Sequence, residues 1–257
     1  MLKLTVFNFF LLIIIAALLF LVKKTVRSER VENLLLLISP IITILFHYST
    51  FIFHAISGGP FIDYLRDTPN LILPIYPCNV VMWSALVIPF LNIKNSRFAR
   101  FLTDYVFWFG ILSTLVGMFA NVDFIKNPTL KDYEITKSIV AHATLLFNVL
   151  LLPIFKRVKV DFWQNLKNIF LSVIEMYVIG LYCNLVFKVL VSPERAYDVN
   201  SMFIIHSPID GINFLKYPII AAIGLLFYAA LFFVCDLIKN KKGERCFNKA
   251  LAFIKKK

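Results

Sequence analysis

One cysteine of this chain stands in a setting that favours a reactive thiol. Cys78 directly follows Pro77 in the segment Leu73-Pro74-Ile75-Tyr76-Pro77-Cys78-Asn79, at the beginning of a long apolar run. Proline suits the first turn of a helix, because its φ is helical and its missing N–H would have no partner there. The free N–H groups and the positive dipole end of such a turn stabilise a thiolate, which is the nucleophilic form of cysteine. A small cysteine that only packs beside a proline kink is the competing interpretation.

Most of the chain is apolar, and this decides the environment in which such a cysteine would work. Of the 257 residues, 60% are hydrophobic and 27 are phenylalanine, and the mean hydropathy is +0.79. A soluble domain, with about half of its residues apolar, does not bury so much apolar surface. The sequence therefore predicts an all-α, multi-pass protein of the cell membrane. Its net charge of +12 does not indicate a nucleic-acid partner, because the basic residues cluster in short loops and the tail, near anionic lipid headgroups.

Seven apolar stretches are each about as long as the 20 residues that a helix needs to cross a bilayer. They are Leu4–Val22, Asn33–Ile56, Leu71–Leu91, Phe101–Ala120, Ile135–Phe155, Asn168–Val191 and Tyr217–Leu237. Nineteen of the 27 Lys and Arg residues lie in the first, third and fifth connections and in the tail, whereas five lie in the N-terminus and the other connections. This alternation predicts seven transmembrane helices with the N-terminus outside and the C-terminus inside. We expect a transmembrane domain over residues 1–238 and a basic cytoplasmic tail over residues 239–257.

The predicted topology brings a histidine to the depth of Cys78. Cys78 and His142 each lie seven residues beyond the start of a predicted helix, which is about 10 Å below the outer boundary. His54 lies near the outer mouth of the second helix, and His47 lies two turns deeper on the same face. Histidine is rare inside membranes and usually faces a bundle interior or a wet cavity. A thiol and an imidazole at one depth could form a thiolate–imidazolium pair, whereas a histidine that only packs between helices is the alternative.

Other polar residues have less specific interpretations. Glu175, a charge within the sixth predicted helix, is a candidate for function or a structural carboxylate bonded to a neighbouring Tyr or Ser. Asn200 belongs to a long outer loop, Ser192–Gly211, that covers the same half of the bundle. We expect Cys78 to be a free thiol rather than a partner of Cys183, because a disulfide would remove the nucleophile. The four cysteines and four histidines form no metal-binding motif, so we predict neither a metal site nor a cofactor.

At these residues the chain resembles the YwaF-like integral membrane proteins, a family that includes the eukaryotic transmembrane protein 164 acyltransferases. The resemblance rests on an L-P-x-x-x-C segment ending at Cys78, on a glycine-containing fourth span around Phe107–Gly117 and on His142 in the fifth span. The segment Asn200-Ser201-Met202-Phe203 is similar to the family's N-Y-x-F segment, although serine replaces the tyrosine. Bacterial relatives often have histidine where Tyr76 stands. The resemblance implies a seven-helix fold and fatty-acyl transfer between phospholipids, with the cysteine as nucleophile and the histidine as its base.

We therefore expect a membrane acyltransferase or acyl hydrolase whose partners are phospholipids or lysophospholipids. Cys78 would attack a fatty-acyl ester to form a thioester, and His142 would carry the proton between thiol, leaving alcohol and acceptor. N–H groups at the helix start would stabilise the oxyanion. The supporting residues that we expect around this pair are Tyr76, Asn79, His54 and Asn200.

Two rival functions use other residues of the same segments. A small-molecule or ion transporter would use Pro74 and Pro77 to break a helix at its substrate site, with Glu175 in the pathway. The absence of an internal repeat speaks against a transporter. A b-type haem protein would use two of the three histidines of the predicted helices, but no paired spacing recurs on two helices.

Overall fold

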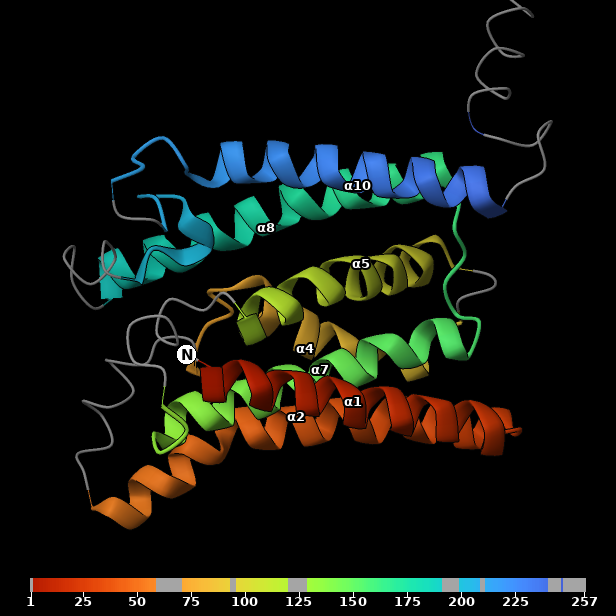
Figure 1. Cartoon of the computed structure of the whole chain (residues 1–257). Coiled ribbons are helices and arrows are strands. Elements are labelled where there is room, and N and C mark those ends of the chain that lie inside the picture. Colours follow the sequence, from red (N-terminus) through yellow and green to blue (C-terminus); the bar gives the residue numbers. More distant parts are fainter. Residues whose placement is uncertain are drawn as a thin grey trace, which may run out of the picture. The chain divides into compact units, whose positions relative to one another are not determined.

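The computed structural model describes residues 2–58, 71–92, 96–119, 129–190, 199–208, 211–239 and 246. Within these ranges all regular structure is helical, as predicted (Figure 1). The α-helices are α1 (Leu2–Thr25), α2 (Glu29–Ser57), α4 (Pro77–Val87), α5 (Arg97–Phe119), α7 (Tyr133–Ile154), α8 (Phe162–Leu190) and α10 (Tyr217–Lys239). Two 3₁₀ turns, η2 (Ile88–Phe90) and η3 (Ser201–Phe203), complete these elements.

Six of the described helices are long and apolar enough to cross a membrane, namely α1, α2, α5, α7, α8 and α10. They coincide with six of the seven predicted spans, and the chain is a multi-pass membrane protein. The direction in which each helix crosses stays a prediction. So does the boundary between membrane domain and tail, because the tail beyond Lys239 lies outside the described residues except for Cys246.

The third predicted span is wrong as a continuous helix from Leu71 to Leu91. Helix α4 begins only at Pro77, and the helical segment through η2 ends at Phe90. Proline disfavours the helical backbone in the residue before it, and Tyr76 is accordingly extended, with φ −123° and ψ 154°. The eleven residues of α4 are about 16 Å long, roughly half the thickness of the hydrocarbon core.

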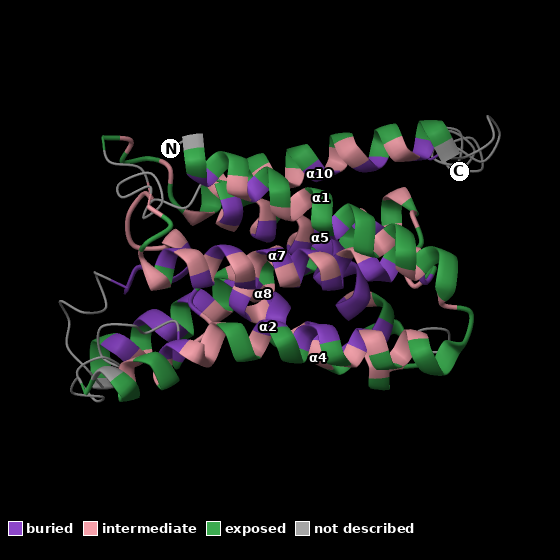
Figure 2. Cartoon of the chain, turned by 60° about the horizontal axis from the view of Figure 1, so that its bottom comes forward, coloured by how far each residue is buried: buried purple, intermediate pink, exposed green. Residues whose placement is uncertain are grey.

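The chain divides into two compact units, Met1–Val158 and Lys159–Lys257. In the first unit α7 is central, because it contacts α1, α2, α4 and α5, and Figure 2 shows buried residues along its length. Helices α4 and α7 both approach α5 at Gly110. A Cβ added there would overlap the side chain of Val149 on α7 and lie 3.2 Å from that of Val81 on α4. The glycine thus lets three helices meet.

The second unit consists of α8, α10 and the loop that carries η3. The two helices pack together, and the Tyr217 hydroxyl at the start of α10 donates a hydrogen bond to the Val173 carbonyl of α8. The loop packs on α8 at Gly180, where an added Cβ would overlap the side chains of Met202 and Ile204. This unit therefore carries a loop that is fastened to one of its membrane helices.

Candidate active site

The first turn of α4 presents the thiol of Cys78 among backbone N–H groups. Tyr76 N donates to Asn79 Oδ1 at 3.2 Å, and Asn79 N donates to the Tyr76 carbonyl at 3.0 Å. Cys78 is the second residue of the helix, which confirms the prediction that Pro77 lies in a first turn. The predicted helix start at Leu71, which would put Cys78 two turns inside the helix, is wrong because Pro74 and Pro77 keep the preceding backbone extended.

On α7, the ring of His142 is held in a defined orientation. Its Nδ1 lies 2.7 Å from the Ser138 carbonyl oxygen of the preceding turn, and 3.5 Å from the Ser138 hydroxyl. A carbonyl oxygen only accepts, so Nδ1 carries the proton and Nε2 of the neutral ring is free to accept one. This is the protonation state that a general base requires.

The Nε2 edge of this ring lies against Gly117 of α5. A Cβ added to Gly117 would overlap Cδ2, Nε2 and Cε1 of His142. Gly117 and Gly110 are seven residues apart on one face of α5, and their contacts on α7, His142 and Val149, are also seven residues apart. Helices α5 and α7 therefore pack in an antiparallel register, with a glycine opposite the histidine.

This register also relates Cys78 to His142. Cys78 precedes Val81 by three residues and His142 precedes Val149 by seven, and both valines meet Gly110. At 1.5 Å per residue, Cys78 lies about 4.5 Å and His142 about 10.5 Å from the level of Gly110 along their helices. Each residue makes its hydrogen bonds within its own helix. That the two side chains face each other stays a prediction, which the packing of both α4 and α7 on α5 at Gly110 supports.

A buried polar cluster joins α2 to α7 at the beginning of α7. The Lys137 ammonium, whose residue is only 9% exposed, binds Glu134 at 2.5 Å and also the hydroxyl of Thr50. Thr50 in turn donates to Glu134 at 2.7 Å. His54, predicted to support the site, stands one helical turn after Thr50 on α2. Sequence reasoning missed this cluster, although Glu134 and Lys137 have the i, i+3 spacing of a helical ion pair.

Comparison with known proteins agrees with these features. The sequence profile of the TMEM164 family matches residues 2–236. The chain belongs to the TMEM164 family. The family assignment predicted from the cysteine, glycine and histidine segments is confirmed, and it extends over α1 and α2 as well. No curated protein and no solved structure gives a match.

In this TMEM164-family chain, Asn200 organises the loop of the second unit that carries η3. Its Oδ1 accepts hydrogen bonds from the backbone N–H groups of Ile205 and His206, and its Nδ2 donates to the His206 carbonyl at 2.8 Å. The next residue, Ser201, is bound on both backbone groups by the side chain of Asn184 on α8. Asn200 and Met202 have positive φ angles of 42° and 54°. Such backbone is strained in residues other than glycine, so the loop is held by these bonds.

The remaining predicted residues belong to other segments. Tyr76 is partly exposed beside Cys78, whereas Asn79 is buried. In the second unit, the Oε2 atom of Glu175 is buried and makes no hydrogen bond within the described part of the chain, so no Tyr or Ser caps that oxygen there. All four cysteines are free thiols. Among the described residues, no group of three His, Cys, Asp or Glu side chains is placed to hold a metal ion.

Proposed function

We propose that this TMEM164-family membrane protein transfers fatty-acyl groups between phospholipids of the cell membrane through a thioester on Cys78. The observation that carries the proposal is the position of the sulfur, on the second residue of α4 and directly after the Pro77 that begins the helix. A helix N-terminus favours negative charge, both on a thiolate and on the oxyanion of an acyl intermediate.

In the first half-reaction, the Cys78 sulfur attacks the carbonyl carbon of a phospholipid ester. His142 Nε2 takes the thiol proton and then gives it to the alcohol oxygen as the carbon–oxygen bond breaks. The products are a lysophospholipid and an acyl-cysteine thioester. The Nδ1–H bond to the Ser138 carbonyl supports this role, because it keeps Nε2 unprotonated before attack.

In the second half-reaction, the hydroxyl of an acceptor lysophospholipid attacks the thioester carbonyl. His142 Nε2 removes the hydroxyl proton, the carbon–sulfur bond breaks, and the proton returns to the sulfur. Water in place of the lysophospholipid gives hydrolysis by the same steps. Transfer and hydrolysis therefore differ only in the acceptor that reaches the thioester.

The direct test is to isolate the acyl-enzyme. Purified protein is incubated with a phospholipid that carries a deuterated acyl chain, and intact-protein mass spectrometry follows the mass increase. We expect one acyl group, released by neutral hydroxylamine and absent from Cys78→Ala, while the control Cys235→Ala retains it. A fully active Cys78→Ala protein in liposomes that contain the donor and a lysophospholipid contradicts the thioester mechanism.

A second candidate function rests on Glu175. A carboxyl group inside a membrane helix, with one buried oxygen that has no hydrogen-bond partner within the described residues, is typical of an ion or proton pathway. This transporter function predicts that Glu175→Gln abolishes activity and that Cys78→Ala is tolerated. The acyltransferase function predicts the opposite, namely that Cys78→Ala abolishes activity and that Glu175→Gln is tolerated.

A further inference from the structure

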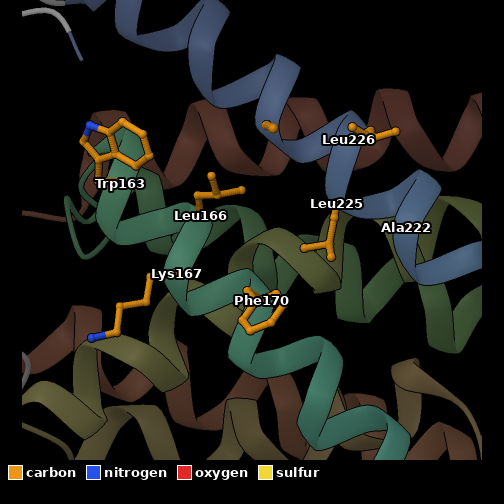
Figure 3. Close-up of a pocket in the computed structure, with 8 residues that line it drawn as sticks. Trp163, Leu166, Lys167, Phe170, Ala222, Leu225 and Leu226 are labelled. Carbon is orange, nitrogen blue, oxygen red and sulfur yellow. The ribbon is translucent and has the colours of Figure 1, made fainter. Parts of the chain in front are cut away.

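The second unit contains a cleft of about 690 Å³ between α8 and α10, within the ~300–1,000 Å³ that is usual for ligand sites. Seven of the eight lining residues are apolar, and Lys167 is the only charged one. The lining residues are Trp163, Leu166, Lys167, Phe170, Ala222, Leu225, Leu226 and Ala229 (Figure 3). The cleft thus has an apolar body and one cation.

The gap follows from the side chains that face each other. Trp163 and Phe170 are seven residues apart on α8, and Ala222 and Ala229 are seven residues apart on α10, so each pair shares a helix face. The two helices run antiparallel, because the start of α10 at Tyr217 bonds to the middle of α8. Two small alanines therefore lie on the face of α10 that meets two large aromatic side chains, and the helices leave a channel about two turns long, or ~10 Å.

The cleft is open on the surface of the second unit. Trp163 is 54%, Phe170 52% and Leu226 72% exposed, so this unit by itself does not close it. Helices α8 and α10 are both apolar enough to cross a membrane. At such a position the surrounding medium is lipid, and an acyl chain is the matching apolar partner.

One end of the cleft has the chemistry of a headgroup site. Figure 3 shows Trp163 and Lys167 at the end of the cleft opposite Ala222, and both belong to the first two turns of α8. Tryptophan is enriched at the membrane–water interface, and lysine extends its ammonium toward the headgroups. Lys167 makes no ion pair with any carboxylate of the described residues, and the exposed Lys159 adds a second positive charge just before the helix.

We propose that this cleft binds one anionic phospholipid, with an acyl chain along Leu166, Phe170 and Leu225 and the phosphate at Lys167. The start of α8 follows a connection rich in Lys and Arg, which the predicted topology places on the cytoplasmic side. Anionic lipids are concentrated in that leaflet, and basic pockets between transmembrane helices on that side bind their headgroups. The site is independent of the acyl chemistry proposed for Cys78.

Native mass spectrometry of the full-length protein tests the headgroup contact. The protein is titrated with phosphatidylglycerol and with phosphatidylcholine that carries the same acyl chains. We expect phosphatidylglycerol to bind more tightly than phosphatidylcholine. Lys167→Gln should lower the affinity for phosphatidylglycerol by about fivefold, which is the effect of one lysine near anionic headgroups. The matched control is Lys188→Gln, which removes an exposed lysine at the other end of α8 and should change nothing. Equal binding of the two lipids, or equal effects of the two variants, overturns the proposal.

The position of the acyl chain is tested separately. Ala222→Phe fills the cleft and should weaken the binding of both lipids. Ala230→Phe adds the same ring at an exposed position outside the cleft and should leave their binding unchanged. Phosphatidylglycerol with a diazirine at mid-chain should cross-link mainly to Phe170 and Leu225. Labelling spread evenly over all exposed helices overturns the proposal. So do cross-links in lipid-free protein from Lys167 to lysines of residues 240–257, because the chain's own tail then occupies the cleft.

Discussion

Replacing Gly117 by alanine should displace His142 while leaving the helices folded. The new Cβ overlaps three atoms of the imidazole ring, so the ring must turn away from Ser138 or α5 and α7 must separate. A displacement of about 1 Å costs a catalytic group roughly 10²-fold in rate, and complete loss of a general base costs ~10²–10⁴-fold. We therefore expect a fall in kcat of about 10²-fold. Overpacking by the new Cβ should lower the free energy of unfolding by ~1–3 kcal/mol. The helix preference for alanine over glycine, ~1 kcal/mol, offsets part of this loss.

The assay is acyl transfer from a labelled phospholipid to a lysophospholipid in liposomes, with thermal unfolding measured on the same samples. Gly224→Ala is the inert control, because a Cβ there meets no atom within 4 Å. Gly110→Ala is the packing control, because its Cβ overlaps Val149 instead of the histidine. Each glycine variant is also combined with His142→Gln. If Gly117 acts through His142, its variant adds little to the loss already caused by His142→Gln, whereas the effect of Gly110→Ala multiplies with it.

Two results would refute this reasoning. One is a folded Gly117→Ala protein with the wild-type rate, which would show that the imidazole can act as a base from a different position. The other is a loss that multiplies with that of His142→Gln, which would show that Gly117 acts by packing alone. Cys78→Ala separates either result from failure of the acyltransferase mechanism itself, because an active Cys78→Ala protein removes the reaction in which His142 is the base.

Three further variants test other parts of the structure. Cys78→Ser keeps a nucleophile that is far less acidic, so transfer should fall severely, and any acyl group that it traps should resist neutral hydroxylamine as an oxygen ester, which mass spectrometry detects. Lys137→Met breaks the ion pair with Glu134 and should lower the free energy of unfolding, measured by denaturant titration, by about 1–2 kcal/mol. Breaking a fully buried pair costs ~3–5 kcal/mol, and the loss is smaller here because the Glu134 side chain is about half exposed. Asn184→Ala removes both hydrogen bonds to the backbone of Ser201. Losing about 1–2 kcal/mol of hydrogen bonding should speed up amide hydrogen exchange of the following residues by at least tenfold. Unchanged exchange would show that the loop is held by other contacts.

The long helices were predictable because each is an uninterrupted apolar run with turn residues or charges at its ends. The start of the third was not, although Pro77 was recognised as a helix-starting residue. Hydropathy counts Leu71–Ile75 as membrane sequence, but it does not report backbone conformation, and Pro74 and Pro77 together keep that stretch out of a helix. The extended backbone before Pro77 and the helix after it thus have the same apolar composition.

The residue types of the candidate site are visible in the sequence, but the contacts that its residues make are not. Cysteine after proline and histidine within an apolar run are visible as residue types. The contact between Gly117 and His142 depends on the register of α5 against α7, which no local pattern gives. Likewise, the bonds of Asn200 to Ile205 and His206 of its own loop could not be read from the sequence, and its support of the active site stays a prediction.

The shortness of α4 links the fold to the proposed chemistry. A helix of about 16 Å spans half of the ~30 Å hydrocarbon core, so at least one of its ends lies at membrane depth. The extended residues before it are tolerated there only where protein covers them; Leu71 and Ile75 are buried, whereas Ile72 and Tyr76 are exposed. At the start of this helix, Tyr76 N donates to Asn79 Oδ1 and Asn79 N donates to the Tyr76 carbonyl, while Pro77 has no N–H. Among the first three residues of the helix, this leaves the N–H of Cys78 beside the sulfur, where the positive end of the helix dipole favours a negative charge on the thiol or on an acyl oxygen.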